Sequence, residues 1–364
     1  MTRSIGVLGT AKNTGKTTTL SAILAALGRR GSRSGLTSIG YDGEDLDNVT
    51  GLPKPRVTAN RGDLVATAAS CFEAAGARLR LVGETGIRTP LGPVLVGEAL
   101  EPGRVVLAGP ATGAGVREVL RIMSGLGPGL VLVDGALNRL VPLMEADGIV
   151  LATGAARSID PARLAREARA IELIFRITRA EAGLAGLVPS GGAPSVAALR
   201  GGSAPVALGF PSILRPEHAA AAVDAAGAGA DALFIPGLAS VDALRDLIER
   251  PGAAWGRRIL LRGPAQLLLA GEPERVLALL GRAREAGVSI ECVAGPPLLA
   301  VTANPFYPAF RGEAGGFYAA AAIDARTLLR SLRAELEAPV SDILLEGPEA
   351  CMAALDGRPG QWTD

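Results

Sequence analysis

One short segment near the N-terminus constrains the fold more than any other part of the sequence. It reads Gly9-Thr10-Ala11-Lys12-Asn13-Thr14-Gly15-Lys16-Thr17 and satisfies the spacing Gly-x-x-x-x-Gly-Lys-Thr. A short apolar run, residues 5–8, precedes the segment, and a stretch with helical spacing of its apolar residues follows from Thr17 to Arg29. The sequence therefore predicts a buried strand, a glycine-containing loop and a helix in that order, which is the start of an α/β fold.

The same spacing predicts a phosphate site. The backbone N–H groups of Thr14 to Thr18 would lie at the positive end of the helix and surround a β-phosphate. Lys16 would reach the β- and γ-phosphates, and Thr17 would offer its hydroxyl to Mg²⁺. The expected ligand is ATP with Mg²⁺, and the alternative is a glycine turn with an incidental lysine. The residues expected to contact the nucleotide are Gly9, Thr10, Lys12, Asn13, Thr14, Gly15, Lys16, Thr17 and Thr18.

Two acids are candidates for the metal. Asp134 directly follows the apolar run 129–133, so we expect it at the carboxyl edge of a buried strand, where ligands bind in open α/β sheets. The alternative is that Asp134 only begins a turn with Gly135. Asp42 follows another predicted strand, 36–39, and is a second candidate, whereas the neighbouring Glu44, Asp45 and Asp47 read as a solvated loop. The catalytic candidates are therefore Lys16, Asp134 and Asp42, and the metal ligands Thr17, Asp42 and Asp134.

Short apolar strands alternate with helical patterns along the chain, which indicates a mostly parallel, doubly wound sheet covered by helices. We expect the further strands of this sheet at 78–82, 105–108, 130–133 and 148–151. A second, smaller Rossmann-like α/β domain is predicted from strands at 232–235, 257–261, 288–293 and 343–346. At 364 residues two domains are the better expectation, and we place them at 1–226 and 227–364.

Composition narrows the class of partner. The chain has 37 basic and 36 acidic residues, so no excess charge attracts it to nucleic acid or to an anionic membrane. Three dispersed cysteines fit a reducing compartment, and the apolar runs are too short to cross a bilayer. We expect a cytoplasmic protein without nucleic-acid or membrane partners.

The loop, with the tripeptide Asp134-Gly135-Ala136, resembles the P-loop NTPase branch that contains dethiobiotin synthetases, molybdopterin-guanine dinucleotide accessory proteins and cobyric-acid synthases. The resemblance implies magnesium ligation by Thr17, Asp42 and Asp134. Members with an intersubunit signature lysine carry it five residues before the Walker lysine, at Ala11, whereas Lys12 is four residues before Lys16. Lys12 therefore contacts a phosphate, forms a salt bridge across a homodimer interface, or does neither.

Four longer strings resemble the KamB-type subunits of lysine 5,6-aminomutase reactivases. They are Gly83 to Gly92 (GETGIRTPLG), Val133 to Arg139 (VDGALNR), Leu151 to Ala155 (LATGA) and Val301 to Pro308 (VTANPFYP). This resemblance implies an accessory NTPase that acts on a cobalamin-dependent aminomutase, with that enzyme or a second reactivase subunit as partner. The alternative function is a biosynthetic enzyme that uses ATP to activate a small carboxylate or amine. The sequence has no Asn-Lys-x-Asp guanine-reading string, which favours adenine.

Three features of these strings have two interpretations. Glu84 and Arg88 follow a strand and are expected to supply polar groups to the ligand edge of the sheet, and Arg139 is expected to contact a phosphate or a substrate carboxylate. For Arg88 and Arg139 the alternative is a surface ion pair. The proline-rich segment 304–308 is predicted to be a rigid loop that either faces a domain cleft or caps the second sheet.

Overall fold

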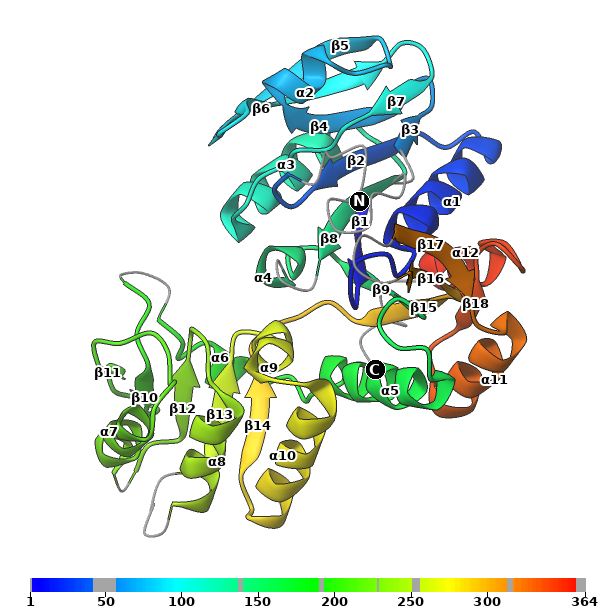
Figure 1. Ribbon diagram of the computed structural model, residues 1–364. Coiled ribbons are helices and arrows are strands. Elements are labelled where there is room, and N and C mark those ends of the chain that lie inside the picture. Colours follow the sequence, from blue (N-terminus) through cyan, green and yellow to red (C-terminus); the bar gives the residue numbers. More distant parts are fainter. Residues whose placement is uncertain are drawn as a thin grey trace. The chain divides into compact units, whose positions relative to one another are not determined.

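The computed structural model describes residues 2–41, 57–136, 140–189, 193–227, 229–250, 256–312 and 317–357. Two compact units make up the chain (Figure 1). The first contains Met1–Ala168 and Pro296–Asp364, and the second contains Arg169–Gly295. This division differs from the predicted boundary near Gly227, because the chain returns to the first unit after residue 295.

A nine-stranded sheet forms the first unit, in the order β18, β15, β9, β1, β8, β2, β4, β6, β5. The strands from β18 to β4 are parallel, and β6 and β5 form an antiparallel hairpin at one edge. The predicted class, a mostly parallel α/β sheet, is confirmed. The strands of this sheet are β1 (Arg3–Gly9), β2 (Ser34–Ser38), β4 (Leu64–Ala68), β5 (Leu79–Thr89), β6 (Gly92–Ala99), β8 (Leu130–Ala136), β9 (Gly148–Gly154), β15 (Leu298–Asn304) and β18 (Val340–Asp342).

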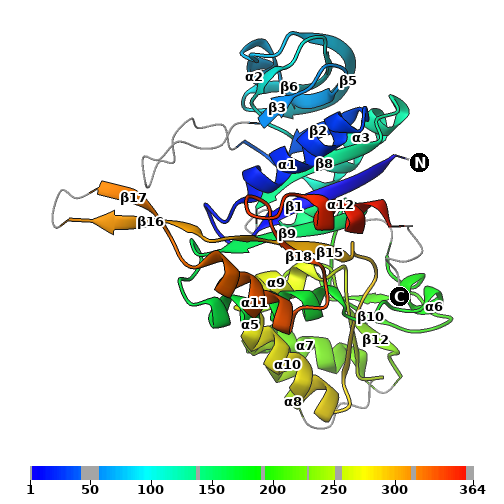
Figure 2. The same ribbon diagram turned by 90° about the vertical axis from the view of Figure 1, so that its right-hand side faces the viewer.

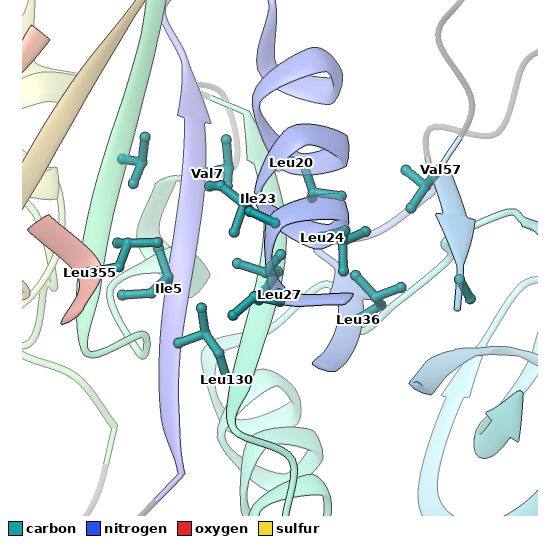
Figure 3. Close-up of a cluster of buried hydrophobic side chains, with 14 of the residues drawn as sticks. Ile5, Val7, Leu20, Ile23, Leu24, Leu27, Leu36, Val57, Leu130 and Leu355 are labelled. Carbon is teal, nitrogen blue, oxygen red and sulfur yellow. The ribbon is translucent and has the colours of Figure 1, made fainter. Parts of the chain in front are cut away.

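Helices cover both faces of this sheet near β1. Ile5 and Val7 of β1 pack with Leu20 and Ile23 of α1 in one buried cluster (Figure 3). The opposite face at Gly6 meets Leu143 of α4. The predicted apolar side of the first helix is therefore confirmed. The helices of this unit are α1 (Lys16–Arg29), α2 (Ala69–Glu73), α3 (Gly113–Gly125), α4 (Leu140–Leu143), α11 (Ala325–Glu335) and α12 (Glu349–Asp356), and α5 (Pro161–Phe175) crosses the division between the units.

The second unit has a five-stranded sheet in the order β11, β10, β12, β13, β14, in which β12, β13 and β14 are parallel. Its strands are β10 (Ala197–Leu199), β11 (Val206–Ala207), β12 (Ala232–Ile235), β13 (Arg258–Leu261) and β14 (Ser289–Cys292). Its helices are α6 (Ala182–Ala185), α7 (Pro216–Ala226), α8 (Val241–Glu249), α9 (Ala265–Ala270) and α10 (Pro273–Glu285).

Several predicted strands differ from the observed ones. Of the strand expected at 105–108, only Val105 lies in a strand. That strand is β7 (Gly103–Val105), which pairs with β3 (Val57–Ala59) in a separate two-stranded sheet. Residues 343–346, where a strand was expected, form a turn, and the strand before them, β18, ends at Asp342 and belongs to the first unit. The segment 304–308 is not a loop that caps the second sheet, because β15 lies in the first sheet and β16 (Phe306–Arg311) begins two residues after it. β16 pairs with β17 (Phe317–Ala322) in a hairpin (Figure 2).

No helix in the described part of the chain combines the length and the apolar character needed to cross a membrane.

Candidate functional site: the loop between β1 and α1

The loop that joins β1 to α1 is held in place by its threonines. The backbone N–H of Thr10 donates to the carbonyl of Ala152 at 3.0 Å, and the Thr10 and Thr153 hydroxyls are hydrogen-bonded at 3.2 Å. The Thr14 hydroxyl donates to the carbonyl of Ala11 at 2.9 Å. Thr10 and Thr14 are both buried. The inward threonines therefore fix the loop against the end of β9 and leave its backbone to shape the site.

Gly15 marks the point where the loop becomes helix. Its φ of +91° is a left-handed conformation that favours glycine. No side chain caps the start of α1, and the first helical bond joins the Thr19 N–H to the Gly15 carbonyl at 2.9 Å. The N–H groups of the first turn have no partner inside a helix and carry its positive end, so they suit an anion.

Lys16 and Asp134 lie together at this helix start. The Lys16 Nζ is 3.0 Å from the Asp134 Oδ1, and their side chains are only 16% and 14% exposed. The pairing follows from the sheet, because β8 lies beside β1 with Asp134 in register with Val7. Sequence reasoning placed both residues at the site, and the structure brings them together. Asp134 therefore lies inside β8 as the strand ends, rather than in the turn that was the alternative interpretation.

The remaining predicted residues have different outcomes. Thr17 and Thr18 are half-buried in the first turn of α1, and Lys12 and Asn13 are exposed on the loop. Asp42 lies outside the described residues, as do Glu44, Asp45, Asp47 and Arg139, so the metal set of Thr17, Asp42 and Asp134 stays a prediction. Within the described ranges, no group of three or more His, Cys, Asp or Glu side chains is placed to hold a metal ion.

Asn304, at the end of β15, is a site residue whose role the sequence did not assign. Its side-chain amide donates to the carbonyl of Asn13 at 2.9 Å and accepts from the N–H of Phe306 at 3.2 Å. A Cβ on Gly15 would lie 3.0 Å from the Asn304 Cβ, and one on Gly154 would lie 2.0 Å from the Asn304 carbonyl oxygen. Asn304 thus joins the loop, β9 and the β16–β17 hairpin.

A depression runs from the loop along the ends of β15 and β18. It is lined by the following residues: Thr14, Gly15, Thr18, Thr19, Thr302, Ala303, Asn304, Asp342, Ile343 and Leu344. At its floor the hydroxyls of Thr19 and Thr302 are 2.7 Å apart. Leu344 is 67% exposed and adds an apolar wall beside the polar loop.

Glu84 and Arg88 do not join this site. Both are exposed on β5, which is separated from β1 in the sheet by β8, β2, β4 and β6. The interpretation that they supply groups to the ligand site is therefore wrong. Their string forms a hairpin at the edge of the sheet rather than a loop after a parallel strand.

The strand, loop and helix, with an acid at the end of the adjacent parallel strand, have the arrangement of P-loop proteins. Comparison with family models and with curated proteins finds no match. Among solved structures, cobyrinic acid a,c-diamide synthase from Mycobacterium smegmatis with bound ATP analog and magnesium aligns at 19% identity with a TM-score of 0.24. That alignment covers 44% of this chain and 61% of the synthase.

Two further structures align at a similar level. The same synthase with bound ADP and magnesium matches at 21% identity with a TM-score of 0.23, over 43% of this chain and 61% of that one. The pNOB8 ParA protein bound to nonspecific DNA matches at 12% identity with a TM-score of 0.25, over 77% and 99% of the two chains. All three likenesses are distant, so the interpretation of the site depends on its own geometry.

Proposed function

We propose that this protein binds Mg-ATP at the loop between β1 and α1 and hydrolyses it. The observation that carries the proposal is the Lys16–Asp134 ion pair, 3.0 Å long, at an uncapped helix start. The first-turn N–H groups and Lys16 offer positive charge to the phosphates. Lys16 suits this role because its compact ammonium on a flexible stem fits where a planar guanidinium would not.

The oxygen donors at the loop fit Mg²⁺, which prefers carboxylate and hydroxyl oxygens together with phosphates. In this proposal Thr17 and Asp134 hold the metal, and Asp42 is the third ligand. When bound, the metal would neutralise negative charge on the phosphates. Lys16 and the first-turn N–H groups orient the phosphate chain, and the 3.0 Å contact places the lysine beside the carboxylate proposed as metal ligand. The depression beside Thr18 and Leu344 offers an apolar wall for a base ring, which we propose is adenine.

The experiment for this proposal separates binding from hydrolysis. We expect Asp134→Asn to lower the rate of phosphate release by at least about 100-fold while nucleotide affinity falls much less, since the N–H groups and Lys16 remain. Binding of a fluorescent ATP analogue and release of phosphate are measured on the same preparation. Equal loss of both, with an altered circular dichroism spectrum, would instead assign Asp134 to the folding of the loop.

We further propose that the hydrolysis serves an accessory role on a cobalamin-dependent aminomutase. The support is the resemblance of four sequence strings to KamB-type reactivase subunits. Three of these strings end β8, β9 and β15, around the loop, so they serve the nucleotide site. The fourth covers the end of β5 and its turn into β6, where Glu84 and Arg88 are exposed and could contact a protein partner. Co-purification with an aminomutase or a second ATPase subunit tests this role, and its reproducible absence would contradict it.

A biosynthetic enzyme that activates a small carboxylate or amine is the second candidate, favoured by Asp134-Gly135-Ala136 at the end of β8. Thiol nucleophiles do not support it, because burial raises the pKa of Cys292 to about 11 and that of Cys351 to about 12. ATP consumption that depends on an added carboxylate or amine would favour this candidate over the accessory role.

A further inference from the structure

The β16–β17 hairpin concentrates the aromatic side chains of this protein. The chain has seven phenylalanines, three tyrosines and two tryptophans, and five of these twelve residues lie in the hairpin. They are Phe306, Tyr307, Phe310, Phe317 and Tyr318. Phe306, Phe310 and Phe317 are 46%, 55% and 68% exposed. Because burial of large aromatic side chains is energetically favourable, groups of them that are exposed mark interaction surfaces.

The hairpin extends from the first unit as a separate two-stranded ladder (Figure 2). Residues opposite one another in an antiparallel pair share a face, so Phe310 and Tyr318 lie together, with ring centroids 5.4 Å apart. Phe317 lies on the other face, opposite Arg311. A two-stranded hairpin is marginally stable by itself in water. Exposed aromatic groups on both faces therefore favour an additional strand or layer.

The two edges of the hairpin differ in chemistry. β16 contains Pro308 and follows Pro305, and proline, which lacks an N–H group, blocks strand pairing at an edge. β17 reads Phe-Tyr-Ala-Ala-Ala-Ala, without proline or charge. Within the described residues β17 pairs with β16 alone. In the part of the chain that the structure describes, the outer edge of β17 is therefore an unpaired template for another strand.

We propose that β17 pairs, antiparallel and edge to edge, with β17 of a second copy of this chain. A twofold axis between the two strands would make a four-stranded sheet in which the same surface serves both copies. Charge is compatible with self-pairing, because Arg311 is the single charged side chain in β16 and β17. In the antiparallel arrangement the two Arg311 side chains lie at opposite ends of the new sheet. A neutral, alanine-rich edge fits a copy of itself and offers little to a polyanion.

The exposed area predicts a weak dimer. Phe317 is the exposed phenylalanine of the pairing strand, and at roughly 200 Å² for a ring side chain it offers about 140 Å² per copy. A standard stable interface buries about 800 Å² per partner, so main-chain bonds along β17 and its alanines must supply the remainder. We expect a reversible dimer with a dissociation constant on the order of micromolar. This inference is independent of the proposed nucleotide chemistry.

Sedimentation velocity of the full chain tests the pairing. Over roughly 1 to 100 µM we expect a concentration-dependent shift from monomer to dimer. Ala320, exposed in the middle of β17, is replaced to give Ala320→Lys and Ala320→Glu. Each variant alone places like charges across the pair and should raise the dissociation constant at least tenfold, whereas an equimolar mixture should dimerise again.

The control is Val206→Lys, which adds the same charge to an exposed residue of edge strand β11 in the second unit and should leave the dimer unchanged. Restoration by mixing shows that the single variants are folded. A wild-type chain that stays monomeric over the whole range would overturn the proposal. So would an Ala320→Lys variant that dimerises like the wild type, or a mixture that stays monomeric.

Discussion

At the scale of single residues, the site depends on backbone geometry as much as on charge. Gly15 holds a left-handed conformation where the loop meets the helix, and its Cα faces Asn304 at close range. Lys16 follows it and reaches Asp134. The glycine therefore places both the first-turn N–H groups and the lysine, which explains why the motif requires it.

Gly15→Ala should cost stability and nucleotide affinity together. The left-handed φ strains alanine by about 1 kcal/mol, and the added Cβ would lie 3.0 Å from the Asn304 Cβ. Gly31→Ala is the matched control, because Gly31 follows the C-cap residue of the same helix with φ +67° and an added Cβ there would have nothing within 4 Å. Thermal unfolding should shift in both variants, but only Gly15→Ala should lose nucleotide binding. Equal binding in the two variants would contradict the role of the loop shape.

At the scale of elements, the local patterns were predictable and the distant pairings were not. The strand, loop and helix around Lys16 follow from apolar spacing and glycine position, and β1 and α1 match that prediction. The predicted second domain included residues 298–304, but β15 belongs to the first unit. Nothing in these residues encodes that their neighbour is β9, about 150 residues earlier in the chain. The role of Asn304 depends on that pairing and was missed for the same reason.

The antiparallel β5–β6 hairpin shows a second limit of local patterns. A turn around Pro90 and Gly92 reverses the chain. Residues 83–89 are mostly polar and do not alternate clearly with apolar residues, so the predicted strand ended at residue 82 although β5 continues to Thr89. One interpretation of the sequence therefore put Glu84 and Arg88 at the ligand edge, whereas both side chains are exposed on an edge strand. In contrast, Asp134 was found because a fully apolar strand leads directly to it.

In the second unit, one ion pair makes the stability of its sheet depend on pH. Arg258 Nε and Nη2 donate to the two carboxylate oxygens of Glu291 at 2.9 and 2.8 Å, between β13 and β14. These hydrogen bonds hold the pKa of Glu291 below its usual value, against the opposing effect of burial. Because the pKa is lowered on folding, the stabilisation is present above the unfolded pKa of about 4.3 and is lost as pH falls through the folded value.

Glu291→Gln should therefore lower the free energy of unfolding by about 1 to 2 kcal/mol at pH 7, and the difference from wild type should shrink below about pH 4. Glu181→Gln is the control, since Glu181 bonds the same Arg258 but is 70% exposed, and its loss should stay within about 0.5 kcal/mol. Urea unfolding at several pH values measures both. A Glu291→Gln deficit that persists unchanged at low pH would show that the carboxylate charge is not its cause.

At the scale of the whole molecule, one sheet carries the candidate nucleotide site, and the unit that contains this sheet is built from two separate parts of the chain. The second unit, Arg169–Gly295, is inserted between β9 and β15, the two strands whose ends flank the loop. Sequence order suggested two successive domains, but the structure has a first unit that the chain leaves and re-enters. Two residues complete the site: Thr153, before the insertion, bonds to Thr10, and Asn304, after it, bonds to Asn13. Both contacts therefore form only when the two parts of that unit have folded together.

The central claim is that Lys16 and its loop bind the phosphates of Mg-ATP, and calorimetric titration of Mg-ATP into the full chain tests it most directly. Lys12 gives a matched control, because it is a lysine of the same loop but is exposed. We predict that Lys16→Ala abolishes measurable binding, whereas Lys12→Ala keeps affinity within about tenfold of wild type. Unchanged affinity in a folded Lys16→Ala variant would contradict the account.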